Sequence, residues 1–233
     1  MSTPLRLEPV VQAGNDEIAD LFERNREWAS RKTQSDPRFF ARLVGQQSPR
    51  YFWVGCSDSR VPATEIVDLD PGEMFVHRNI ANLVPRSDTN FNAALLFAVN
   101  VLRVRHILVV GHYGCGGIRA VRKAVANDAI GLWLAPVRAL CWQHRGALHA
   151  LPDEQAREDR LCELNVVDQV EQVCANPVVK QAWRDGHDLT VHGLIYAIGD
   201  GLLQSVCEPV SRIALGHAHA RSDDDDDDDE NIS

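Results

Sequence analysis

YFWVGCSDSR, residues 51–60, is a run of apolar and aromatic side chains that passes directly into a polar loop. This order is typical of a buried β-strand whose carboxyl end carries functional groups. HILVVGHYGCGG, residues 106–117, repeats the order, with a glycine-rich turn after the apolar run. We expect two further strands over 74–77 and 189–196.

Helical segments separate these strands. An Asn176-Pro177 pair favours the start of a helix, because Asn is a good cap and Pro is tolerated in the first turn. The pattern of apolar residues predicts helices over 92–103, 132–144, 153–174 and 177–186. Strands that alternate with helices predict an α/β fold, with a mainly parallel central sheet flanked by helices.

The two ends of the chain differ from this pattern. An amphipathic N-terminal helix is expected over 15–28, where Ile18, Leu21 and Phe22 fall at helical spacing. Without an internal repeat or a linker, residues 1–216 are expected to form a single domain. Residues 217–233 are rich in Asp and are predicted to be a disordered acidic tail.

Composition excludes several classes of protein. The formal net charge is −9, but the acidic run 223–230 carries eight negative charges, so the rest of the chain is nearly neutral. A nearly neutral body lacks the clustered Lys and Arg of a nucleic-acid binder. No apolar run is long enough for a membrane span or a secretory signal, so no membrane partner and a cytoplasmic location are expected.

Cysteine and histidine at two strand ends carry the chemistry. Cys56 follows the first strand, and His112 and Cys115 follow the strand within 106–117. Two Cys and one His form a catalytic zinc set that leaves one position of a tetrahedron open. Taken singly, such residues are more often a buried thiol or a hydrogen-bonded loop histidine. The remaining thiols are interpreted as core or incidental residues: Cys141, Cys162, Cys174 and Cys207.

The sequence resembles the β-class carbonic anhydrases of the bacterial type. Within that type, the bicarbonate-regulated subgroup is the more specific interpretation. The resemblance rests on Cys-x-Asp-x-Arg at 56–60 and His-x-x-Cys at 112–115. It extends over about residues 15–204 and includes the segments PRYFWVG (49–55), FVHRNIAN (75–82), LCELNV (161–166) and VHG (191–193).

The resemblance implies the fold of that family and its activity. One zinc ion per chain would be held by Cys56, His112 and Cys115, and carbon dioxide would be hydrated reversibly to bicarbonate and a proton. The domain over 1–216 would then be a zinc-enzyme domain. The assembly would be a homodimer or a dimer of dimers, with active sites at the subunit interface.

Asp58 and Arg60 match the Asp-Arg dyad of the family. Two thiolates and a neutral imidazole cancel the charge of Zn²⁺, so a bound water should be less acidified than at a site of three histidines. Asp58 could accept the hydrogen of the zinc-bound hydroxide, and Arg60 could fix Asp58 by a charge-assisted hydrogen bond. Gln47 matches a position that donates its amide to a substrate oxygen, although a solvated Gln is the plainer interpretation.

Trp53, Arg78 and Tyr196 match a non-catalytic bicarbonate site found in one subgroup. In that subgroup bicarbonate favours a closed state, in which the residue matching Asp58 becomes a fourth zinc ligand. The alternative is that Trp53 and Tyr196 are ordinary core or interface residues with a polar tip.

Three other functions stay open. A glycine-rich turn after a strand is typical of nucleotide binding, but 106–117 lacks the Lys of a phosphate loop. A thiol redox protein or phosphatase would use Cys56 as nucleophile and Arg60 as anion clamp, which leaves His112 and Cys115 unexplained. A zinc hydrolase of another small linear substrate, such as carbon disulfide, would keep the metal site. The segment after Leu203 also departs from the C-terminal helix of the family.

Overall fold

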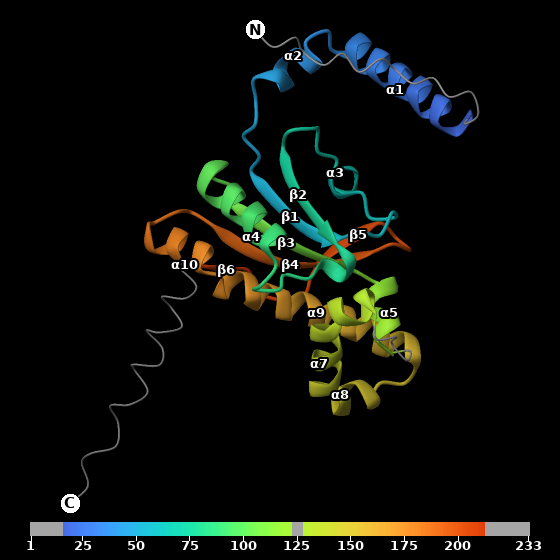
Figure 1. Cartoon of the computed structure of the whole chain (residues 1–233), viewed down its shortest axis with the longest axis vertical. Helices are drawn as coiled ribbons and strands as arrows, with labels where there is room; N and C mark the ends of the chain where they lie inside the picture. Colours follow the sequence, from blue (N-terminus) through green and yellow to red (C-terminus); the bar gives the residue numbers. More distant parts are fainter. Residues whose placement is uncertain (1–15, 123–127, 213–233) are drawn as a thin grey trace, which may run out of the picture. The chain divides into compact units, whose positions relative to one another are not determined.

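Six strands form one sheet in the computed structural model, which describes residues 16–122 and 128–212 (Figure 1). The order is β2-β1-β3-β4-β5, and β6 also pairs with β4. The strands are β1 (Tyr51–Cys56), β2 (Met74–Asn79), β3 (His106–His112), β4 (Thr190–Ala197), β5 (Leu202–Ser205) and β6 (Val210–Ser211).

The core of the sheet is parallel. β1 pairs in parallel with β2 and β3, and β3 pairs in parallel with β4, whereas β5 and β6 are antiparallel to β4. The predicted α/β fold with a mainly parallel sheet is therefore confirmed, and the four expected strands lie within a residue or two of the ends predicted for them. β5 and β6 were not predicted.

Helices pack against one face of the sheet, and the buried side chains between them form the larger of two apolar clusters. Phe52, Val54 and Cys56 of β1 face this cluster, and Val166 and Val170 come from the long helix α9. In the described residues after Gln47, the helices and short helical turns on both faces are α3 (Ala63–Ile66), η1 (Ile80–Asn82), α4 (Thr89–Leu96), η2 (Phe97–Val101), α5 (Gly116–Arg122), α6 (Ala129–Trp133), α7 (Ala135–Gln143), α8 (Arg145–His149), α9 (Glu154–Ala175) and α10 (Pro177–Arg184).

The opposite face carries a smaller cluster. Trp53 of β1 packs there with Val61 and Ala63, near or in α3, and with Met74 of β2. Because side chains alternate along a strand, Trp53 and Cys56 belong to opposite faces.

Two of the predicted helices are each divided in the structure. The segment expected over 92–103 consists of α4 and the π-helical turn η2. The segment expected over 132–144 is divided between α6 and α7, and Pro136 lies in the first turn of α7. The other two match α9 and α10, where Asp153 and Asn176 cap the amino ends by accepting hydrogen bonds from Ala156 N and Val178 N.

The chain divides by its contacts into residues 1–46 and 47–233. In the first unit, the expected N-terminal helix is α1 (Asp16–Ser35), followed by α2 (Phe39–Val44), and Trp28 packs against Phe39 and Phe40. Within the described part of the chain, no helix is long and apolar enough to cross a membrane. The single domain over 1–216 stays a prediction, and the predicted acidic tail, 217–233, lies outside the described residues.

Candidate metal centre

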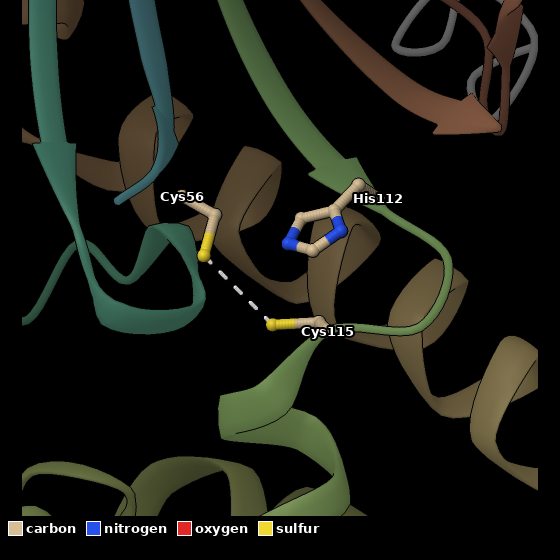
Figure 2. Close-up of side chains that lie close together, drawn as sticks. All are labelled: Cys56, His112 and Cys115. Carbon is tan, nitrogen blue, oxygen red and sulfur yellow. Dashed lines mark hydrogen bonds between the residues drawn. The ribbon is translucent and has the colours of Figure 1, made fainter. Parts of the chain in front are cut away.

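Cys56 and His112 are the last residues of two neighbouring parallel strands. β1 and β3 pair as far as Gly55 and Val110, so their carboxyl ends lie at the same edge of the sheet. After His112, Gly114 adopts φ = 67°, a left-handed conformation that suits glycine, and the chain turns back to place Cys115 directly before α5. The three side chains therefore face one another (Figure 2).

The geometry of this group fits zinc. Cys56 Sγ and Cys115 Sγ are 3.8 Å apart, and the ligand atoms of the three residues lie within 4.8 Å of one another. With a zinc–sulfur bond of about 2.3 Å, the edge between two sulfurs of a tetrahedron measures about 3.8 Å. Each residue is at most 4% exposed. The Cys-His-Cys group therefore fits a zinc site.

His112 has one nitrogen left for a metal. Its Nδ1 lies 3.0 Å from the backbone oxygen of Tyr113, which can only accept, so Nδ1 carries the proton. Nε2 is then an acceptor, and this buried atom has no hydrogen-bond partner among the described residues. A buried lone pair without a partner is costly, and a metal ion is the partner that suits it.

The two thiols differ in their affinity for a proton. The hydrogen bond from Cys115 lowers the pKa of Cys56, and the backbone N–H groups of Asp58 and Ala81 lower it further. The same hydrogen bond, together with burial, raises the pKa of Cys115. The pair therefore loses its first proton readily and holds its second strongly, and a bound cation would take the place of that second proton.

Asp58 is held beside the three residues by Arg60. Arg60 donates to both carboxylate oxygens, from Nε to Oδ1 at 2.9 Å and from Nη2 to Oδ2 at 2.8 Å. This guanidinium holds the pKa of Asp58 well below its usual range, against the opposing effect of partial burial. Asp58 Oδ2 lies 3.8 Å from His112 Nε2, so an ionised carboxylate borders the site.

Arg78 binds the loop that carries Cys56 and Asp58. It donates from Nε to Cys56 O at 2.8 Å and from Nη2 to Asp58 O at 2.5 Å. Trp53 and Tyr196 belong to the smaller apolar cluster on the same face of the sheet as Arg78. Trp53 is fully buried, and its indole nitrogen has no hydrogen-bond partner in residues 16–122 and 128–212.

Gln47 is not brought to the metal centre of its own chain by β1. It precedes this strand and is exposed, whereas Cys56 ends the strand. Six residues of strand span about 20 Å. The two residues therefore lie toward opposite ends of β1.

Sequence reasoning assigned no role to three amide residues behind the centre. Asn79, Asn165 and Gln169 bind the backbone of the turn that follows β2. Asn79 and Asn165 lie in two of the segments that carry the family resemblance, but a sequence does not show which backbone atoms a buried amide will reach.

Comparison with known proteins gives a consistent result. The sequence profile of a family described as carbonic anhydrase matches residues 51–203. A carbonic anhydrase of Emericella nidulans is 43% identical over 186 residues, which cover 80% of this chain and 82% of that protein. A β-carbonic anhydrase of Coccomyxa, solved with acetazolamide, has a TM-score of 0.83 at 34% identity and covers 90% of this chain and 99% of its own. A tetrameric β-carbonic anhydrase of Sordaria macrospora has a TM-score of 0.81 at 35% identity and covers 84% and 100%.

Proposed function

Because this chain belongs to the β-class carbonic anhydrases, we propose that Cys56, His112 and Cys115 hold its zinc ion and that carbon dioxide is hydrated beside them. The observation that carries this proposal is the convergence of three buried ligand atoms within 4.8 Å. One ion per chain follows, because this is the one such group in the described part of the chain. The products are bicarbonate and a proton, and the reaction is reversible.

Asp58 and Arg60 act on the attacking oxygen. Zinc, when bound, is a Lewis acid that lowers the pKa of water and so supplies a nucleophile for carbon dioxide. Because Asp58 stays ionised, its carboxylate can only accept a hydrogen bond. The attacking oxygen would donate its hydrogen to Asp58, so that a lone pair of this oxygen would face carbon dioxide. Arg60 keeps the carboxylate in one orientation through two hydrogen bonds.

Gln47 acts from a second copy of the chain. Its position beyond the amino end of β1 separates it from the Cys56 at the carboxyl end. Its amide can therefore donate to a substrate oxygen in the centre of a partner subunit, which fits a homodimer with active sites at the interface. The Sordaria macrospora relative is tetrameric, and a dimer of dimers is the larger assembly proposed here. A cytoplasmic location stays a prediction.

Bicarbonate inhibits the enzyme through Arg78, as in the bicarbonate-regulated bacterial subgroup. An anion bound to Arg78 would compete for the guanidinium that now binds Cys56 O and Asp58 O. Loss of those bonds would free the loop, so that Asp58 could leave Arg60 and become a fourth zinc ligand. Trp53, whose buried N–H lacks a partner among the described residues, and Tyr196 supply donors for the same anion.

Zinc content and carbon dioxide hydration of three serine variants test the proposed ligands. Cys56→Ser and Cys115→Ser should each lose zinc and hydration together, because both thiolates are ligands. Cys141→Ser is the matched control, since Cys141 is a half-buried thiol outside the cluster and should keep both. A thiol enzyme would behave differently, because Cys115→Ser and zinc removal would both leave its activity intact.

A further inference from the structure

The turn after β2 has an unfavourable backbone. Ala81 (φ = 63°) and Asn82 (φ = 48°) are consecutive residues in the left-handed region, which residues other than glycine rarely adopt. Such strain persists when surrounding groups hold it, and it is concentrated at functional sites. Ala81 is completely buried and Asn82 is 2% exposed, so water does not stabilise this turn.

Three side-chain amides hold the turn in place. Asn79 clasps Leu83 from both sides, donating to Leu83 O at 2.7 Å and accepting from Leu83 N at 2.8 Å. Asn165, on α9, donates to Ala81 O at 2.9 Å. Gln169, one turn further along α9, donates to Asn165 Oδ1 at 3.3 Å and accepts from Val84 N at 2.9 Å.

Burying a side-chain amide costs desolvation free energy, which its hydrogen bonds must offset. Asn165 is 1% exposed and Gln169 is 3% exposed, on a helix that also buries apolar side chains such as Val166 and Val170. Apolar residues at the same positions would pack without the cost of desolvating a polar group. The amides therefore point to a need for this conformation of the turn.

The turn contacts the segments that carry two residues of the metal centre, Cys56 and Cys115. Cys56 pairs with Asn79, the residue before the turn, and Ser57 N donates to Asn79 O at 2.9 Å, so the loop after Cys56 is bonded to the start of the turn. The Ala81 N–H is also one of the two backbone groups that lower the pKa of Cys56. The start of α5 also rests on the turn, because a Cβ at Gly117 would come within 3.2 Å of Ala81 Cβ. Groups that donate to a metal ligand fix its orientation and its charge, and their loss typically lowers metal affinity.

We propose that Asn165 is a positioning residue of the metal centre, which binds Ala81 O and so keeps the left-handed turn that directs the Ala81 N–H at Cys56 Sγ. Asn165 touches neither substrate nor metal and acts through the turn. This inference rests on the proposed role of Cys56 as a zinc ligand.

Zinc affinity measured by competition with a chelator, at a temperature where all variants are folded, tests this role. Asn165→Ala should weaken zinc binding by about 10- to 100-fold. Asn176→Ala is the control, because it removes a helix cap and a hydrogen bond to Asn92 without touching the turn. Unchanged zinc affinity in Asn165→Ala, or an equal loss in both variants, would show that Asn165 is merely structural.

A second measurement uses the unsubstituted sequence and does not depend on the folding of a variant. In protein loaded with ¹¹³Cd in place of zinc, NMR should detect a scalar coupling between the metal and the Ala81 amide proton, transmitted through the hydrogen bond to the Cys56 sulfur. Bound ¹¹³Cd without this coupling would refute the inference and leave the proposed function intact. Failure to bind either metal would instead refute the zinc site itself.

Discussion

The low pKa of Asp58 is due first to its hydrogen bond with Arg60. Arg60 holds the pKa of Asp58 below its usual range, so the folded value lies below that of the unfolded chain, about 3.9. The pair therefore stabilises the fold above the unfolded pKa, and this contribution is lost as the pH falls toward the folded pKa. Arg60→Gln should raise the pKa of Asp58 toward its ordinary value.

Carboxyl ¹³C NMR measures that change directly. In the wild type, the Asp58 signal should stay at its ionised position at pH values where an ordinary aspartate is already protonated. In Arg60→Gln it should titrate at a higher pH than in the wild type. Identical titrations in the two proteins would mean that Arg60 does not control the charge of Asp58.

Tyr196 offers a milder test of the bicarbonate site than Trp53. Trp53 is fully buried, so truncating it would create a cavity and cost about 3–5 kcal/mol. Tyr196→Phe removes one hydroxyl from a half-buried ring and should weaken inhibition by bicarbonate while zinc content is kept. Inhibition constants of the two proteins at neutral pH give the answer, and equal constants would remove Tyr196 from the proposed site.

β3 and α9 approach each other closely at Gly111. A Cβ at this position would lie 2.5 Å from Val166 Cγ2 and 3.2 Å from Ile195 Cδ1, so a larger residue must displace α9 or β4. Gly111→Ala should therefore lower the free energy of unfolding by about 1–3 kcal/mol. Urea unfolding of the zinc-loaded protein measures the difference.

Gly146 in α8 provides the comparison for Gly111. A Cβ there would meet nothing within 4 Å, and alanine is the better helix former. Gly146→Ala should be neutral or stabilising by up to about 1 kcal/mol. If Gly111→Ala were equally harmless, the close contact between β3 and α9 would not be as tight as the structure has it.

Strands with continuous apolar runs were predictable, and the short antiparallel strands β5 and β6 were not. β1 and β3 are buried on both faces, so their sequences alone indicate strands. β5 is four residues long and mostly exposed, and it forms because Gly201 (φ = 76°) turns the chain back along β4. η2 was missed for a similar reason, because a local pattern does not distinguish a π-helical turn from an α-helix.

The same contrast holds for the metal centre. Cys56, His112 and Cys115 could be chosen from sequence because soft ligands at the carboxyl ends of parallel strands converge at one edge. The hydrogen bond of Asn165 joins residues 84 positions apart, and it depends on the strained conformation of Ala81. Neither feature follows from composition, spacing or periodicity.

Assembly decides whether the active site is complete. If Gln47 acts in the centre of a partner subunit, Gln47→Ala and Asp58→Asn should each be poorly active alone, because every site lacks one group. Co-refolding the two variants as a mixture should restore hydration, since a mixed dimer has one site with an intact Asp58 and an intact Gln47 from the other chain. No restoration would mean that Gln47 acts within its own subunit or not at all.

The most direct test of the central claim is the stopped-flow rate of carbon dioxide hydration as zinc is returned to metal-free protein. The rate should rise in proportion to bound zinc and level off at about one ion per chain, because Cys56, His112 and Cys115 form one site. Hydration by protein without zinc, or full zinc occupancy without hydration at any pH, would contradict the proposed function.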